Sequence, residues 1–316
     1  GIAGGWKSPS MPTNAGSAAI IRMNEDGTFF LMSSGMEIGQ GAATVLPQIA
    51  AEVLSVDPSK ITFCSGDTDH TPYEWQTVAS RTTYCAGNAV KLAAEDLRDK
   101  VLDLAQIKMG AVKRDLKFED GYVVHKIYPE RRVPISEFAL GVSFPDGSGY
   151  GGPAIGVGTF TLENNINTDK KTGVAKHHPA AFWTMGVNGA EVEVDTELGT
   201  IKLINHFGGS DAGVIVNPLP LRNQVQSFYA GTDLALMEET VWDQNDYRVL
   251  NPSNLDYKTR TFNEVTQHDH IVLETNKGKD PRYPFGANGV GEPLLAPGGP
   301  AIRMAVYNAC GVWINE

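Results

Sequence analysis

The stretch Phe285-Gly-Ala-Asn-Gly-Val-Gly-Glu-Pro-Leu-Leu-Ala-Pro-Gly-Gly-Pro300 decides how the rest of this chain is interpreted. It surrounds a single carboxylate, that of Glu292, with glycines and prolines. Glycine lets a backbone approach other groups closely, and Pro293 restricts the backbone directly after Glu292. Residues 301–310 follow with apolar side chains at helical spacing, so the sequence predicts a stiff loop held against a packed helix.

A carboxylate on such a loop is suited to act as a general base. A base must lie within reach of the proton that it accepts before its pKa matters. An exposed glutamate on an ordinary surface loop fits the same residues equally well. Both interpretations of Glu292 stay open at this point.

Composition excludes several classes of protein. The chain has 316 residues, 41% hydrophobic and 20% charged, which is typical of a soluble globular protein with one large domain or two ordinary ones. A net charge of −11 argues against nucleic acid or an anionic membrane as the main partner. No apolar run approaches the roughly 20 residues of a membrane span. Residues 1–6 lack the pattern of a signal peptide, and the missing initiator Met indicates processing or trimming.

The cysteines Cys64, Cys85 and Cys310 lie far apart and form no C-x-x-C pair. This spacing argues against a disulfide framework, a zinc site or an iron–sulfur site on this chain. Their apolar neighbours indicate small core residues. A reducing, cytoplasmic location is the expectation that follows.

Two glycine- or hydroxyl-rich turns precede predicted helices. Residues 35–41 lead into an amphipathic helix at about 42–54, and Ser80, Arg81, Thr82 and Thr83 begin a long helix at about 83–108. Free N–H groups and the positive end of the helix dipole make each turn a candidate anion site. The spacing matches neither a dinucleotide fingerprint nor a P-loop, so a plain strand-to-helix turn and ordinary helix capping explain the two turns as well.

The remaining pattern mixes strands and helices and predicts an α+β fold. Asp-Gly at residues 26–27 predicts a hairpin between two β-rich runs. Residues 66–72 carry Asp67, Asp69 and His70 without metal-site spacing and are interpreted as a polar turn. Other expected elements are a strand at 61–64, a hairpin at 118–124, a short helix at 135–140, strands at 183–195 and 200–205, and a helix from Asn217-Pro218 through Tyr229.

Several of these segments together resemble the molybdenum hydroxylases, the family of xanthine dehydrogenase and aldehyde oxidase. The matching segments, in chain order, are Gly39-Gln-Gly41 with Thr44 and Gln48–Glu52, Ala79–Thr82 with Gly87–Val90, Glu191–Asp195, Asn217-Pro218 with Gln224, and Gly289-Val-Gly-Glu-Pro293. The resemblance covers nearly the whole chain. It implies the C-terminal half of the family's molybdopterin-binding subunit, with mixed sheets and packed helices, as two intertwined α+β subdomains dividing near residues 150–180.

The resemblance also implies roles for individual residues. Glu292 would be the catalytic base, and Gln224 would lie near the apical oxygen of the molybdenum. The residues that would contact the pterin are Gly39, Gln40, Gly41, Ala79, Ser80, Arg81, Thr82, Thr83, Val290 and Gly291. No protein side chain would bind the metal directly, because the pterin dithiolene holds it.

The chain departs from the family pattern at a few positions. Asn223 stands where relatives have glycine, Gln226-Ser227 where they have Glu-Gly, and Asn288 where many have lysine. These departures leave the cofactor interpretation intact and weaken inference about the substrate. The chain matches only the C-terminal half of the family's molybdopterin-binding subunit. A subunit divided in this way resembles the medium subunit of nicotinate dehydrogenases.

The implied activity is hydroxylation of an aza-aromatic carbon, with water as the oxygen source. Molybdopterin, in its cytosine dinucleotide form, would be the cofactor of this chain. The implied partners are a larger molybdopterin subunit with the N-terminal half, an iron–sulfur subunit, an FAD subunit and a small aromatic or heteroaromatic substrate. The alternatives are an aldehyde or aryl-CoA oxidoreductase, a non-catalytic cofactor scaffold and an unrelated α/β binding protein.

Overall fold

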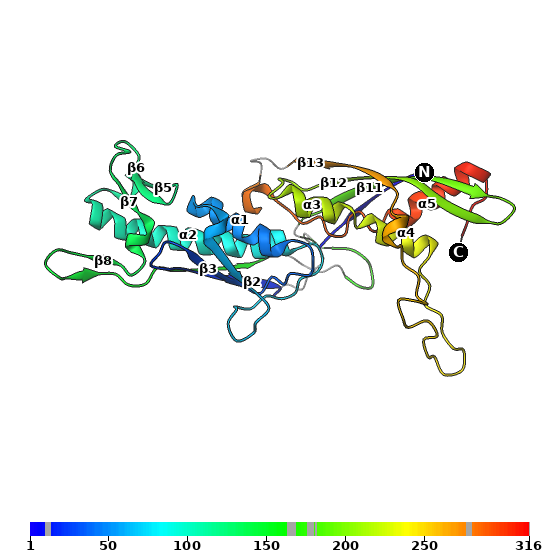
Figure 1. The fold of residues 1–316 in the computed structure, drawn as a ribbon, viewed down its shortest axis with the longest axis horizontal. Coiled ribbons are helices and arrows are strands. Elements are labelled where there is room, and N and C mark those ends of the chain that lie inside the picture. Colours follow the sequence, from blue (N-terminus) through cyan, green and yellow to red (C-terminus); the bar gives the residue numbers. More distant parts are fainter. Residues whose placement is uncertain (10–13, 163–168, 176–179, 181, 276–279, 316) are drawn as a thin grey trace. The chain divides into compact units, whose positions relative to one another are not determined.

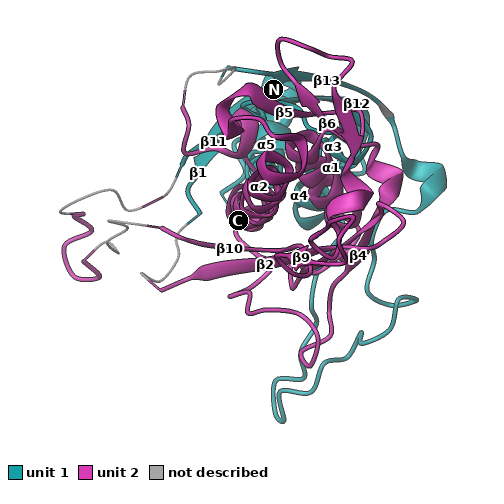
Figure 2. Cartoon of the chain, turned by 90° about the vertical axis from the view of Figure 1, so that its left-hand side faces the viewer, with its two compact units in different colours: residues 1–9, 182–277, 290–316 teal, residues 10–181, 278–289 magenta. Residues whose placement is uncertain are grey.

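The computed structural model describes residues 1–9, 14–162, 169–175, 180, 182–275 and 280–315. The chain divides into two compact units, each built from segments that are distant in sequence (Figure 2). Unit 1 comprises Gly1–Pro9, Phe182–Lys277 and Val290–Glu316, and unit 2 comprises Ser10–Ala181 and Gly278–Gly289. Both units contain helices and sheets, which confirms the α+β class.

Unit 2 is built on a four-stranded sheet in the order β10-β2-β3-β4, of which Figure 1 labels β2 and β3. Its strands are β2 (Gly16–Met23), β3 (Phe29–Ser33), β4 (Ile61–Cys64) and β10 (Ile155–Thr161). Helix α2 (Thr82–Met109) packs on β10 and β2, and α1 (Ala42–Leu54) packs on α2. The approach is close, because a Cβ at Gly158 would lie 2.2 Å from the carbonyl oxygen of Ala89 on α2.

Smaller elements complete unit 2. They are β5 (Leu116–Glu119), β6 (Tyr122–His125), β7 (Arg132–Pro134), β8 (Val142–Ser143), β9 (Gly149–Tyr150), and the 3₁₀ turns η1 (Pro58–Lys60), η2 (Lys113–Asp115), η3 (Ile135–Phe138) and η5 (Pro284–Gly286). The described part of the chain contains no helix with both the length and the apolar character needed to cross a bilayer.

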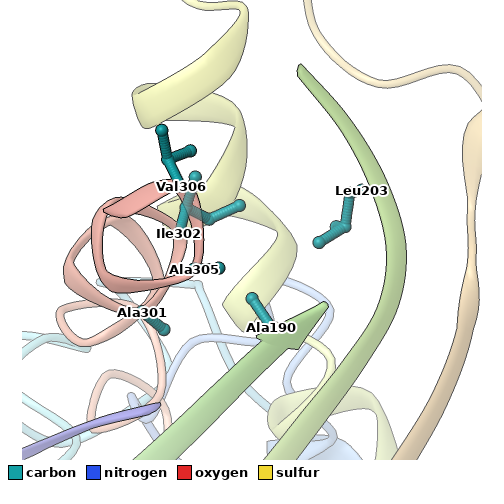
Figure 3. Packing of buried hydrophobic residues seen from close by; sticks show 6 residues of the cluster. All are labelled: Ala190, Leu203, Ala301, Ile302, Ala305 and Val306. Atoms are coloured by element: carbon teal, nitrogen blue, oxygen red, sulfur yellow. The ribbon is translucent and has the colours of Figure 1, made fainter. Parts of the chain in front are cut away.

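Unit 1 is built on a second four-stranded sheet, in the order β1-β11-β12-β13. Its elements are β1 (Ile2–Lys7), β11 (Thr184–Asp195), β12 (Thr200–Asp211), β13 (Gln267–Leu273), α3 (Pro218–Val225), α4 (Phe228–Leu236), η4 (Phe262–Glu264) and α5 (Gly298–Cys310). All neighbouring strands are antiparallel except β12 and β13. Helix α5 lies against β11, and its apolar stripe buries Ala301, Ile302, Ala305 and Val306 with Ala190 and Leu203 of the sheet (Figure 3).

Most predicted elements have their expected positions. The helix at 42–54 and the strand at 61–64 are confirmed at the predicted residues, and the Asp26-Gly27 hairpin joins β2 to β3. Helix α2 begins at Thr82, one residue earlier than predicted, and β12 continues beyond residue 205 to Asp211.

The helix predicted from Asn217 through Tyr229 is interrupted. The structure ends α3 at Val225 and starts α4 at Phe228. Across this junction the Ser227 N–H donates to the carbonyl oxygen of Gln224, which is an i→i−3 bond rather than the i→i−4 bond of an α-helix. The tighter turn lets Val225 and Phe228 both pack on Leu294, and all three side chains are fully buried.

His206 is an unusual member of the unit 1 core. Its ring is completely buried and stacks on Phe228 with a 3.5 Å centroid separation. Neither ring nitrogen forms a hydrogen bond with any described residue. Burial disfavours the imidazolium and, with smaller contributions from the charges of His268 and Arg260, lowers the pKa of His206 from 6.5 to about 4.

The buried His206 makes the stability of the chain depend on pH. The pKa of the His206 imidazole is 6.5 in the unfolded chain and about 4 in the folded chain. Between these pH values the unfolded chain binds more protons, so the stability of the folded chain should fall as pH decreases through this window. The expected loss is about 3 kcal/mol in the free energy of unfolding by urea. His206→Phe should remove most of this dependence, whereas His70→Gln, on an exposed turn, should leave it. An unchanged pH dependence in His206→Phe would contradict the assignment.

Candidate active site

The loop that carries Glu292 lies directly on the buried face of the unit 1 sheet. A Cβ at Gly186 of β11 would lie 2.2 Å from the carbonyl oxygen of Pro293, and a Cβ at Gly231 of α4 would lie 2.0 Å from that of Leu295. These distances are far below van der Waals contact, so only glycine permits the approach. The backbone on the C-terminal side of Glu292 is therefore held between strand β11 and helix α4.

A buried side chain adds a directional contact to this packing. The Asn188 Nδ2 donates a 2.6 Å hydrogen bond to the carbonyl oxygen of Leu294, and Asn188 is completely buried. The Leu294 side chain is equally buried. The stiff loop predicted around Glu292 is therefore present, and the sheet and the helix both fix it.

Glu292 itself is half exposed and forms an ion pair with Lys7. The exposed fraction of its side chain is 46%, compared with 25% for Lys7. Lys7 is the last residue of the edge strand β1, which pairs with β11. This partner lies 285 positions away in the sequence, and sequence analysis did not find it.

The Gly39-Gln40-Gly41 turn precedes helix α1 as predicted, but an internal carboxylate occupies its N–H groups. The Glu37 carboxylate accepts hydrogen bonds from the N–H groups of Gly39, Gly41 and Ala43, at 2.7, 3.0 and 2.8 Å. Gln40 is also engaged within the turn, since its side chain donates to the Met36 carbonyl and accepts from the Ile38 N–H. The first candidate anion site is thus filled by the chain's own anion.

The electrostatics of Glu37 agree with this geometry. Burial raises the pKa of the Glu37 carboxyl, but the backbone hydrogen bonds from Ala43, Gly41, Gly39 and Gln40 together outweigh it and bring the pKa below its ordinary value. Glu37 is therefore ionised near neutral pH. A carboxylate at a helix N-terminus also interacts favourably with the helix dipole.

The second candidate anion site, at the start of α2, has a different character. The main chain of Ala79 and Ser80 has φ of +59° and +55°, a region that non-glycine residues rarely adopt. The N-cap residue Arg81 contributes no side-chain cap, and the N–H groups of Thr82 and Thr83 meet no acceptor among the described residues. This helix start therefore has N–H groups that a bound anion would satisfy.

Two other segments of unit 2 lie beside this helix start. The Met36 N–H donates to the Thr77 Oγ1 at 2.9 Å, which joins the Glu37 turn to the segment before α2. A Cβ at Gly289 would lie 1.7 Å from the carbonyl oxygen of Ser80, so the residues just before Val290 pack directly on this turn. Segments that the sequence analysis singled out separately therefore meet within unit 2.

The Arg81 side chain does not extend toward a ligand. Its guanidinium is completely buried, pairs with Glu74, and donates to the Gln76 carbonyl at 2.7 Å and to the Ser17 Oγ at 3.0 Å. The guanidinium predicted as part of an anion site is thus a structural group that joins the segment before α2 to strand β2. The Arg81 backbone is engaged as well, since its N–H donates to the Val78 carbonyl at 3.2 Å and its carbonyl accepts from the Cys85 N–H at 2.7 Å.

The remaining predicted residues divide between the two units. Gln224 is partly buried in α3, Val290 is buried and Gly291 is partly buried, and all three belong to unit 1 with Glu292. The residues at 39–41 and 79–83 belong to unit 2. At residues 66–72 the Asp67 carboxylate accepts the Asp69 N–H and pairs with His70, as a polar turn does. No group of three or more potential metal-binding side chains occurs among the described residues.

The chain matches the molybdopterin cofactor-binding domain family over residues 1–266. It is 32% identical over 300 residues to the xanthine dehydrogenase molybdenum-binding subunit of Escherichia coli O157:H7, covering 94% of this chain and 37% of that protein. This chain belongs to the molybdenum hydroxylases. The resemblance inferred from the five sequence segments is thereby confirmed.

Other molybdenum hydroxylases match at lower identity. The nicotine 6-hydroxylase large subunit of Paenarthrobacter nicotinovorans is 26% identical over 292 residues, covering 92% of this chain and 34% of that subunit. This molybdenum hydroxylase chain thus spans about a third of the length of these curated relatives.

Solved structures of the family share the fold. The Cu,Mo-CO dehydrogenase superposes with a TM-score of 0.82 at 23% identity, covering 98% of this chain and 38% of that one. Quinoline 2-oxidoreductase from Pseudomonas putida 86 gives a TM-score of 0.81 at 24% identity, covering 98% and 39%. At these identities the likeness concerns the fold alone.

The glycine at position 186 should be essential for the position of the Glu292 loop. Gly186→Ala places a Cβ against the carbonyl oxygen of Pro293 and should displace the loop, with an expected cost of about 1–3 kcal/mol in urea unfolding. Gly4→Ala is the matched control, because its Cβ would meet its nearest neighbour at an ordinary 3.8 Å. Equal stability of the two variants would contradict the clamped loop.

Glu37 should be required for the order of the turn before α1. Glu37→Gln removes the charge and leaves one acceptor oxygen for three N–H groups, so the variant should lose about 1–2 kcal/mol of stability. Hydrogen exchange at the Gly41 and Ala43 amides should accelerate. Glu25→Gln, on the exposed β2–β3 turn, removes the same charge and serves as control. Unchanged protection of these amides in Glu37→Gln would show that the turn is held by other contacts.

Proposed function

We propose that this chain is the part of a molybdenum hydroxylase that holds molybdopterin and supplies the catalytic base, Glu292. The observation that carries the proposal is the loop of Glu292. Its backbone is fixed on the sheet at Gly186 and Asn188, while its carboxylate stays half exposed. A rigid main chain beneath an accessible carboxylate is what a general base requires.

The residues in unit 2 fit a phosphate-bearing pterin at one of the two candidate sites. The start of α2 offers the N–H groups of Thr82 and Thr83, preceded by two strained residues, and backbone strain of this kind gathers at functional sites. We assign the phosphate contact to Ala79, Ser80 and the first turn of α2. The Glu37 carboxylate already accepts the N–H groups of the Gly39–Gly41 turn. This turn would therefore contact the pterin by van der Waals packing rather than by N–H hydrogen bonds.

The bound cofactor would supply the electron acceptor and the activated, water-derived oxygen of the hydroxylation. Glu292 would accept the proton that the water-derived oxygen gives up in the reaction. Gln224, Val290 and Gly291 would contact the cofactor. None of this chemistry would require a metal ligand from this chain.

We further propose a nitrogen heteroaromatic substrate of the nicotinate class. Support comes from relatives named for xanthine and for nicotine, both nitrogen heterocycles. An aldehyde or aryl-CoA substrate is the alternative within the same family. Separate subunits are also part of the proposal, because the xanthine dehydrogenase and nicotine 6-hydroxylase relatives are both named as subunits. A larger molybdopterin subunit, an iron–sulfur subunit and an FAD subunit would complete the enzyme, with the pterin as its cytosine dinucleotide.

The substitution Glu292→Gln tests the proposal, because it keeps the size of the side chain and removes its basicity. The assembled enzyme should keep its molybdenum content and lose about 10²–10⁴ in the rate at which substrate reduces the cofactor in a single turnover. Re-oxidation of the reduced enzyme should be unchanged, because no proton transfer to Glu292 is involved.

Glu193→Gln, an exposed carboxylate on β11, is the matched control and should react at the parental rate. If Glu292→Gln were reduced at the parental rate with full molybdenum content, this chain would be a cofactor scaffold and the base would belong to a partner chain.

A further inference from the structure

The Glu292 carboxylate has a partner that its sequence neighbourhood does not reveal. The Lys7 Nζ donates to the Glu292 Oε2, and the pair joins the end of strand β1 to the glycine-rich loop. Both residues belong to unit 1, so their pairing is a property of one compact body. An ion pair between partly exposed side chains contributes little to stability. A role of this pair would therefore lie in how it orients the two charged groups.

The backbone of Lys7 is as firmly placed as that of Glu292. Lys7 pairs with Thr184 in the antiparallel register of β1 and β11, and the Thr184 Oγ1 donates to the Lys7 carbonyl at 3.2 Å. Thr184 is completely buried. The backbone of Lys7 is thus fixed by strand pairing, and the backbone after Glu292 is fixed by the packing of its loop. Strand β11 provides both contacts.

We infer that Lys7 is a positioning residue for the base: its ammonium holds the Glu292 carboxylate in one orientation before substrate arrives. This inference rests on the proposed role of Glu292. Replacing Lys7 would remove this contact with the carboxylate, and a displacement of about 1 Å from productive geometry is enough to cost about 10²-fold in rate.

Proton transfer to Glu292 also changes the net charge of the Lys7–Glu292 pair. One proton moves to a carboxylate oxygen of Glu292 and no electrons move at this pair. The pair therefore changes from zero net charge to +1, and the ammonium that remains favours negative charge developing on a nearby substrate. The lysine ammonium is a compact point charge, whereas the arginine guanidinium is planar and larger. Arginine at position 7 should therefore restore the charge but only part of the contact geometry.

The test compares Lys7→Met and Lys7→Arg in the assembled enzyme, each with Glu292 and with Glu292→Gln. With Glu292 present, Lys7→Met should lower kcat by about 10–10²-fold, with a smaller change in KM and the same molybdenum content. Lys7→Arg should recover most of this loss. In the Glu292→Gln background Lys7→Met should have almost no further effect, because its role is exerted through the carboxylate.

A second readout needs no cofactor. In the isolated chain an acylating reagent followed by mass spectrometry reports how readily each lysine reacts. Glu292→Gln should increase the modification rate of Lys7 severalfold and leave that of Lys202, an exposed lysine on β12, unchanged. Lys202→Met provides the matched control for activity and should behave as the parent.

The outcomes separate this inference from the proposed function. If Glu292→Gln retained the parental rate, the proposed base and its positioning residue would both be rejected. If Glu292→Gln were slow but Lys7→Met were as fast as the parent, only the role of Lys7 would be rejected. The same holds if Lys7→Met were equally harmful with and without Glu292, or if Lys7 acylation were unaffected by Glu292→Gln. Loss of folding in Lys7→Met would leave Lys7→Arg and the acylation rates to decide.

Discussion

The close approach of one backbone to another organises unit 1. The carbonyl oxygens of Pro293 and Leu295 occupy the space where the side chains of residues 186 and 231 would begin, so strand β11 and helix α4 together fix the loop between them. A backbone contact of this kind has no rotamers and little freedom to relax. The sheet thereby fixes the position of Glu292. It also fixes Lys7, which lies on strand β1 beside β11 and pairs with Glu292.

Three carboxylates show how environment assigns a role to one chemical group. Glu37 satisfies backbone N–H groups and is consumed in ordering a turn. Glu74 is buried against the Arg81 guanidinium and joins two segments of unit 2. Glu292 pairs with Lys7 and remains half exposed, so it combines a fixed position with access to a reacting group. Accessibility distinguishes the candidate base from the two structural acids.

The two helix starts differ in the same way. Helix α1 and helix α2 both begin at polar or glycine-rich turns, and either would attract an anion through its dipole. At α1 that attraction is already satisfied within the chain, whereas at α2 the side chain of the N-cap residue is buried elsewhere. The strained main chain at Ala79 and Ser80 lies beside this second start. An anion-binding pattern in a sequence therefore needs its internal acids counted before a ligand is assigned.

The sequence by itself determined the local elements, the family and the candidate base. Periodicity placed α1 and β4 at their residues, because burial of one face is written into the spacing of apolar side chains. Glycines and prolines around Glu292 identified a stiff loop, because their backbone preferences are local. Tertiary structure alone decided the partners. Lys7 pairs with Glu292 across 285 positions of sequence, the Glu37 carboxylate binds the N–H groups of its own turn, and the Arg81 side chain is buried against Glu74. Pairings across the sheet depend on register and on which chain segments pack together, and single-residue preferences carry no information about either.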